Sequence, residues 1–175
     1  MVREIWKDSN DNPGKKDASE FHTIMIIGER TGGRSYTALD LTDPDDPVFR
    51  WTWPPPGSTE ALLAGESWAD FSPNAPPIVP VAVADDSGTF EVGGVKAAER
   101  WGVFLSGGTD ALMMRGRNVT LIDAYTGEPM WRFSAQDSTG SSDLRSKLWP
   151  VAATVAAIDI GLDEDADARP DGLFD

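Results

Sequence analysis

The sequence predicts an all-β protein, a partial β-propeller built from about four blades' worth of short antiparallel strands with Gly/Pro-rich loops. Glycine (17), proline (13) and tryptophan (7) are frequent among the 175 residues, which is typical of a turn-rich β protein. Short β-branched or aromatic segments end repeatedly in glycine or aspartate, and no long helical pattern interrupts them. A sandwich of two sheets is the main structural alternative.

The expected strands follow one another along the chain, with turn signals between them. Each is a short run of alternating or continuous apolar residues. They cover residues 21–28, 35–41, 48–53, 78–84, 89–92, 101–108, 118–123, 128–133 and 150–158. An Asp-Asp-Ser-Gly turn at 85–88 is expected to fold 89–92 back onto 78–84 as a hairpin. Residues 59–63 can form a short helix.

An internal repeat relates two parts of the chain. Asp40 and Asp123 end equivalent strands, and each is followed by a Thr-containing turn and an aromatic strand. Trp51 lies eleven residues after the first aspartate and Trp131 eight residues after the second. The interval of 83 residues between the aspartates corresponds to about two propeller blades of roughly 40–45 residues each.

The repeat suggests a simple domain organisation. Residues 1–20 are predicted to be a polar leader or loop, and residues 21–175 part of a C-terminal β-propeller domain. Most propellers need more than four blades to close, so this domain is expected to be incomplete and the chain to be a fragment.

Charge and composition exclude several classes of protein. The absence of cysteine excludes a disulfide scaffold, a thiolate zinc site and a cysteine nucleophile. The net charge of −14 disfavours nucleic acid as a partner. No apolar run is long enough to span a membrane, and the N-terminal residues lack the apolar centre of a signal peptide. An export signal would therefore belong to a longer protein.

The strongest candidate site is an acidic run near the C-terminus. Asp163, Asp165, Asp167 and Asp171 occupy positions 1, 3, 5 and 9 of a nine-residue loop. Alternate carboxylates can converge on one hard cation, and the Arg169 carbonyl at position 7 would be a natural backbone ligand for Ca²⁺. The alternative is a solvated acidic turn, since six of the fourteen net negative charges lie in residues 159–175.

Three further patterns have simpler structural interpretations. Residues 28–35 resemble a phosphate loop, but Arg34 stands where lysine is required and no helix follows, so a hairpin loop is expected. His22 has no partner at a motif spacing, which predicts an ordinary, partly buried ring rather than a member of a catalytic triad. The tryptophans could stack a quinone or a sugar, but packing between blades is favoured.

Four blocks of the sequence resemble the C-terminal β-propeller of PilY/PilC-type tip adhesins of type IV pili. They are residues 23–44, the Trp-containing segment 65–78, the strand segments 101–108 and 119–127, and the acidic run 163–171. The last is similar to the family's Asp-x-Asp-x-Asp-x-x-x-Asp calcium loop, although Ala166 and Ala168 stand where that family often has glycine. No catalytic residues are expected.

The resemblance implies a non-enzymatic pilus adhesin or biogenesis protein in which calcium occupancy regulates extension, retraction and adhesion. Its partners would be pilins or minor pilins and a host or abiotic surface, reached through the full-length protein. It would act outside the cell, at the pilus tip or the outer-membrane surface. Two alternatives remain: a quinoprotein dehydrogenase-like propeller that uses pyrroloquinoline quinone, and a generic envelope scaffold that binds proteins.

Overall fold

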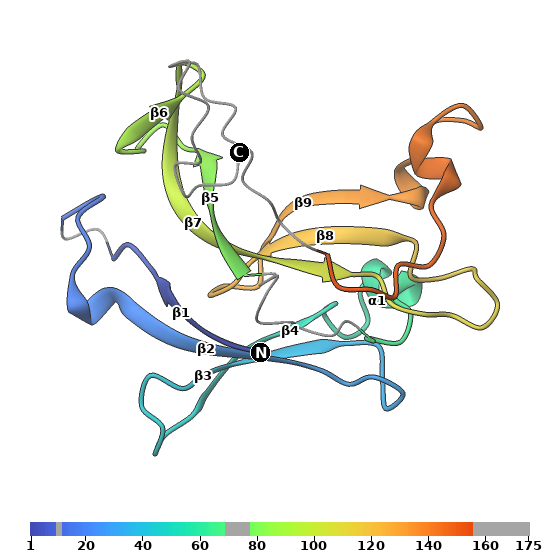
Figure 1. Ribbon diagram of the computed structural model, residues 1–175, viewed down its shortest axis with the longest axis horizontal. Helices are drawn as coiled ribbons and strands as arrows, with labels where there is room; N and C mark the ends of the chain where they lie inside the picture. Colours follow the sequence, from blue (N-terminus) through green and yellow to red (C-terminus); the bar gives the residue numbers. More distant parts are fainter. Residues whose placement is uncertain (10–11, 69–77, 156–175) are drawn as a thin grey trace.

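A computed structural model describes residues 1–9, 12–68 and 78–155. They form two antiparallel sheets that pack face to face, and the helical segments that accompany them are short (Figure 1). The all-β class and the partial β-propeller architecture predicted from the sequence are confirmed, because the described chain folds into two antiparallel sheets of four and five strands with little helix. In the described part of the chain, no helix is long and apolar enough to cross a bilayer.

The first sheet follows the chain order β1-β2-β3-β4. Its strands are β1 (Val2–Trp6), β2 (Phe21–Gly28), β3 (Tyr36–Asp40) and β4 (Val48–Trp53). Alternation explains the buried face: Ile24 and Ile26 on β2 are fully buried and point to the same side of the sheet.

Strand β1 differs from the expectation that residues 1–20 are a polar leader. Val2–Trp6 pair with β2 in an antiparallel register, and Ile5 and Trp6 are buried. Burial of these two side chains and pairing of the backbone groups stabilise the strand, although Arg3 and Glu4 are charged and Val2 is exposed. The segment 7–9 and 12–17, which connects β1 to the 3₁₀ turn η1 (Ala18–Glu20), contains no strand or helix.

The second sheet has the order β5-β7-β8-β9, and the short strand β6 also pairs with β7. The strands are β5 (Ile78–Ala84), β6 (Phe90–Val92), β7 (Val95–Ser106), β8 (Asn118–Asp123) and β9 (Pro129–Ser134). The predicted hairpin between 78–84 and 89–92 is wrong, since β6 pairs with β7 instead of β5. Gly93 and Gly94 both have positive φ, which is the backbone conformation that a two-residue hairpin turn requires, so β6 turns directly into β7.

The remaining regular elements are short. They are α1 (Thr59–Leu63), which matches the predicted helix, and the 3₁₀ turns η2 (Ala135–Asp137) and η3 (Leu144–Lys147). Ser58 caps α1 by accepting a hydrogen bond from the backbone N–H of Ala61 at 3.1 Å. The strand predicted at 150–158 is absent from its described part, residues 150–155. Val151 instead donates to the Gly116 carbonyl and accepts from the Gly108 N–H, which fixes it against the β7–β8 loop.

The two sheets are structural repeats of each other. Trp51 pairs with Ala38, two residues before Asp40, and Trp131 pairs with Leu121, two residues before Asp123. A register shift follows each of these pairs at the same place in the ladder. The 83-residue interval therefore separates neighbouring sheets, whereas the sequence suggested a separation of two blades. The reason is that each sheet includes long connections, such as the extended β6–β7 hairpin.

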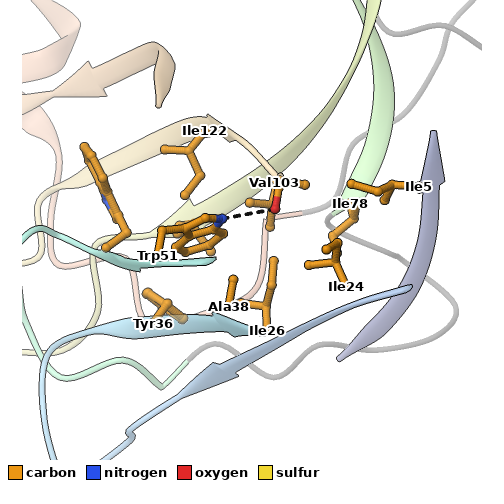
Figure 2. Close-up of a cluster of buried hydrophobic side chains, with 12 residues drawn as sticks. Ile5, Ile24, Ile26, Tyr36, Ala38, Trp51, Ile78, Val103 and Ile122 are labelled. Carbon is orange, nitrogen blue, oxygen red and sulfur yellow. Dashed lines mark hydrogen bonds between the residues drawn. The ribbon is translucent and has the colours of Figure 1, made fainter. Parts of the chain in front are cut away.

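The main hydrophobic core lies between the two sheets (Figure 2). Ile24, Ile26 and Ala38 of the first sheet face Val103 and Ile122 of the second sheet, and all five are fully buried. Complete burial of an isoleucine or valine side chain contributes about 1.5–3 kcal/mol to folding. This shared core holds the two sheets in one fixed arrangement and positions the loops at their edges.

Candidate functional site: the aspartate turns between the sheets

The predicted calcium ligands Asp163, Asp165, Asp167, Arg169 and Asp171 lie outside the described residues. Within residues 1–9, 12–68 and 78–155, no group of three or more His, Asp or Glu side chains is arranged to hold a metal ion. The calcium loop therefore stays a prediction. The described site with the richest chemistry lies elsewhere, at the two aspartates that end β3 and β8.

Asp40 is the centre of a buried polar cluster on the first sheet. Its carboxylate is 5% exposed. One oxygen, Oδ1, accepts hydrogen bonds from the backbone N–H and the hydroxyl of Thr42, at 3.0 and 2.5 Å. The other, Oδ2, accepts from Arg50 Nη2 at 2.5 Å and lies 3.1 Å from His22 Nδ1. Every lone pair that burial removes from water thus gains a partner.

These contacts change the acidity of Asp40. Burial is the largest single influence and disfavours the charged carboxylate. The hydrogen bonds from Thr42 and Arg50, together with the charge of Arg50, outweigh burial and lower the pKa of Asp40 to about 2. Asp40 is therefore an anion at neutral pH, and its chemistry is that of a structural anchor rather than a proton donor.

The Asp40 cluster reaches across to the second sheet through Tyr125, in the β8–β9 turn. The guanidinium carbon of Arg50 lies 4.1 Å from the centre of the Tyr125 ring, within the range of a cation–π interaction. The His22 ring lies 4.6 Å from the same ring, tilted by 53°. Tyr125 therefore contacts two partners of Asp40, and the cluster couples the ends of two sheets.

His22 is partly buried, as predicted, and its surroundings do not form a catalytic triad. Asp40 Oδ2 and Thr42 Oγ1 both lie near the same ring nitrogen, Nδ1, at 3.1 and 3.5 Å. A proton relay needs the carboxylate and the nucleophile on opposite nitrogens of the ring. The arrangement orients the imidazole against Tyr125 instead.

Asp123 organises the equivalent turn of the second sheet. Its Oδ1 accepts hydrogen bonds from the backbone N–H groups of Tyr125 and Thr126, both at 2.8 Å. The N–H of Gly127 donates to the Asp123 carbonyl at 2.8 Å, which closes the turn. Side-chain oxygens of aspartate often stabilise tight turns in this way. The buried Asp123 carboxylate thus fixes the position of residues 124–127.

Trp51 of the first sheet packs on this turn. Its indole Nε1 donates to the Ala124 carbonyl at 3.1 Å, shown by the dashed line in Figure 2. Gly127 lies so close to the indole that a Cβ at this position would be 2.5 Å from Trp51 Cγ. The expectation that the tryptophans pack between blades is confirmed for Trp51.

Sequence reasoning found Asp40 and Asp123 but missed Arg50 and Tyr125. The available signal was an arginine within the aromatic strand 48–53, shortly after a strand that ends in aspartate. The predicted hairpin loop at 28–35 is confirmed, because β2 and β3 pair on either side of it. This excludes the strand-to-helix connection that a phosphate loop needs.

The lowered pKa of Asp40 predicts how acid affects stability. The folded-state pKa lies below the ordinary value of 3.8, so its stabilising effect is complete above about pH 4 and disappears as the pH falls toward 2. We expect Asp40→Asn to lower the free energy of unfolding by about 2 kcal/mol at pH 7. Urea unfolding at several pH values should show this difference shrinking toward pH 2.

The neighbouring Asp43 supplies the matched control. It lies on the exposed turn after β3, and its carboxylate only accepts a hydrogen bond from the Asp45 N–H. Asp43→Asn should change stability by about 0.5 kcal/mol or less at any pH. A constant difference between wild type and Asp40→Asn from pH 7 to pH 2 would contradict the assigned role of the Asp40 charge.

The fold and this site define a class of protein: an all-β chain of two propeller-type blades joined by tryptophan–turn and aspartate–arginine–tyrosine contacts. Neither a protein-family model nor a curated protein matches the sequence. Among solved structures, the C-terminal domain of PilY1 from Pseudomonas aeruginosa is similar over 80% of this chain, with a TM-score of 0.44 and 20% sequence identity. The chain spans 22% of the length of that structure.

Proposed function

We propose that this chain is the calcium-binding β-propeller portion of a type IV pilus tip-associated adhesin or biogenesis protein. The observation that carries the proposal is the resemblance of residues 23–44 to the PilY/PilC-type propeller, extended by the other three blocks. This block includes Tyr36, Asp40 and Thr42. Asp40 and Thr42 belong to the polar cluster beside Tyr125, and the Tyr36 hydroxyl donates to the Ser106 carbonyl of the second sheet at 3.2 Å. The most specific part of the resemblance thus coincides with residues that join the sheets.

Calcium is the proposed ion because of the ligand chemistry of residues 163–171. Four carboxylates and the Arg169 carbonyl supply hard oxygen donors, which Ca²⁺ prefers. The ion would neutralise clustered negative charge and so couple its binding to the conformation of the loop. Alanines at 166 and 168, where glycine would ease positive φ, are expected to weaken binding by about 1 kcal/mol.

In this proposal the protein is not an enzyme. Its partners are pilins or minor pilins and a host or abiotic surface, and it acts at the pilus tip or the outer-membrane surface. Calcium occupancy would shift the balance between pilus extension and retraction. The conformational change would originate in the acidic loop and pass to the rest of the propeller.

Calorimetric titration tests the calcium site. Asp163→Ala and Asp171→Ala should each weaken the calcium Kd at least about tenfold, because each removes a charged ligand from the first shell of the ion. Glu164→Ala is the matched control: it removes one negative charge from an even position of the loop and should leave the affinity within about twofold. Equal affinity in all three variants would exclude the proposed ligand set.

The same variants test the cellular role. In the bacterium that encodes the protein, deletion of the gene should reduce surface pili, and the wild-type gene should restore them. Asp163→Ala should restore pili with altered calcium dependence, whereas Glu164→Ala should behave as wild type. Unchanged piliation in the deletion strain, or redox-dye reduction by the purified protein after addition of pyrroloquinoline quinone, would refute the proposal.

A further inference from the structure

The outer face of the second sheet repeats the face that the first sheet presents to it. On the first sheet, Ile26 pairs with Ala38 and Ala38 pairs with Trp51, across neighbouring strands. On the second sheet, Phe104 pairs with Leu121 and Leu121 pairs with Trp131. Leu121 lies two residues before Asp123, as Ala38 lies two residues before Asp40, so the two rows are equivalent. In both rows the side chains lie on the same side of the sheet as the tryptophan.

These equivalent faces differ in their surroundings. Trp51 is 6% exposed because it packs on the second sheet, whereas Trp131 is 49% exposed. Beside Trp131 lies an open apolar hollow of about 490 Å³, lined mainly by Val81, Val83, Phe104, Leu121, Met130 and Trp131. The Phe133 ring stacks near Trp131, at 6.2 Å between centroids. None of the side chains that line the hollow is charged, and Phe133 beside it is also apolar.

The contact made by Trp51 shows what such a face binds. It requires a turn with a carbonyl to accept the indole N–H and a glycine beneath the ring, which Ala124 and Gly127 provide. The glycine comes four residues after the strand-ending Asp123. A larger residue there would displace the indole, because the space for its Cβ is occupied by Trp51.

We propose that the outer face of the second sheet binds a further four-stranded blade of the same polypeptide. That blade would have a glycine four residues after its strand-ending aspartate, and Trp131 would pack on its turn as Trp51 packs on residues 124–127. The inference rests on the propeller architecture in the proposed function, and it adds the face and the turn that join the next blade.

A second copy of this chain does not fit this face. Its first sheet has Pro44 four residues after Asp40, where the contact requires glycine. Its second sheet has Gly127, but Trp51 of that copy already covers this turn. Neither described turn of another copy is therefore open to Trp131, which is why the occupant is assigned to a blade outside the described residues.

Photo-crosslinking in the polypeptide that the gene encodes tests the proposal. Trp131 is replaced by p-benzoylphenylalanine, a conservative change because the side chain is half exposed. After irradiation, peptide mass spectrometry should find an intramolecular crosslink to a turn of the form Asp-x-x-x-Gly. A crosslink to a second copy, to another protein or to any other kind of segment would overturn the proposal, and so would no crosslink.

Two control positions make the result decisive. The same probe at Tyr125 should crosslink to Arg50 or its neighbours on β4, since the Tyr125 ring lies 4.1 Å from the Arg50 guanidinium carbon. The probe at Trp149, which is 69% exposed and does not line the hollow, should give no turn-specific crosslink.

Oxidative footprinting provides a second measurement without substitution. In the recombinant chain 1–175, Trp131 should be modified much faster than Trp51. In the full polypeptide, Trp131 should be protected to the level of Trp51, while Trp149 stays reactive. Equal reactivity of Trp131 in both samples would overturn the proposal. Calcium binding and piliation are measured separately, so failure of this blade contact is distinguishable from failure of the proposed function.

Discussion

Replacing Trp51 with alanine is expected to lower the free energy of unfolding of the 175-residue chain by about 3–5 kcal/mol. The indole is 6% exposed and fills the space between β4 and the β8–β9 turn. Its removal leaves a cavity and also leaves the buried Ala124 carbonyl without its hydrogen-bond donor. Equilibrium unfolding in urea, followed by circular dichroism, measures the change.

Trp131→Ala is the matched control, because Trp131 occupies the same position in the second sheet. Its side chain is 49% exposed, so the same substitution in the isolated chain should cost about 1 kcal/mol or less. If both substitutions lowered the free energy of unfolding by a similar amount, the burial of Trp51 would not be what stabilises the contact between the sheets. If Trp131→Ala lowered the free energy of unfolding only in the full polypeptide, that result would agree with the proposed blade contact.

Substituting Gly127 with valine is expected to be nearly as severe, with a loss of about 2–5 kcal/mol. Two effects add. Gly127 has φ of +77°, where an L-residue costs roughly 1–2 kcal/mol and a β-branched one is least tolerated. The new Cβ would also lie 2.5 Å from Trp51 Cγ, and overpacking of this kind costs about 1–3 kcal/mol. Urea unfolding gives the total.

Gly57→Val separates the two effects. Gly57 has nearly the same φ, +79°, but no atom lies within 4 Å of the position of its Cβ. This variant should therefore show only the backbone cost of about 1–2 kcal/mol. The excess loss at Gly127 measures the steric conflict with Trp51, and the absence of any excess would contradict the tight packing of the indole on the turn.

Local pattern predicted most of the strands because the physical signals are local. Alternating and β-branched apolar segments gave the correct bounds for β2, β4, β5 and β8, and a short helix was correctly placed at Thr59–Leu63. The repeat was found because Asp40 and Asp123 perform the same task. Each must end a strand and accept hydrogen bonds from the backbone of the next turn, so the same residue type recurs.

Errors arose where the partner of a segment decides its structure. Val2–Trp6 is predicted, together with the polar residues that follow it, as a leader or loop, yet pairing with β2 makes it a strand. Val151 and its neighbours are apolar enough to suggest a strand, yet no strand lies beside the described part of 150–158 and the segment is held by single hydrogen bonds to the β7–β8 loop. Strand propensity depends on the neighbour that completes the ladder, and the neighbour is distant in sequence.

The polar cluster around Asp40 likewise combines a feature that the sequence reveals with contacts that depend on residues distant in the sequence. An aspartate at a strand end was visible in the sequence, but Arg50 and Tyr125 are 75 residues apart in it and meet only because the sheets pack face to face. Their contact could not be predicted without the crossing of β4 over the β8–β9 turn. The lowered pKa of Asp40, in contrast, has local causes: hydrogen bonds from Thr42, two residues away in the chain, and from Arg50 in the same β3–β4 hairpin.

The sequence by itself therefore determined the all-β class, the positions of most strands and the recurrence of an aspartate turn followed by tryptophan. These follow from backbone propensity, side-chain alternation and turn chemistry, which act over a few residues. Only the tertiary structure decided that the repeated units are neighbouring sheets, that Trp51 is buried on Gly127 and that the equivalent Trp131 is exposed. Identical local patterns acquire different environments because burial depends on which surface of the fold lies opposite each side chain.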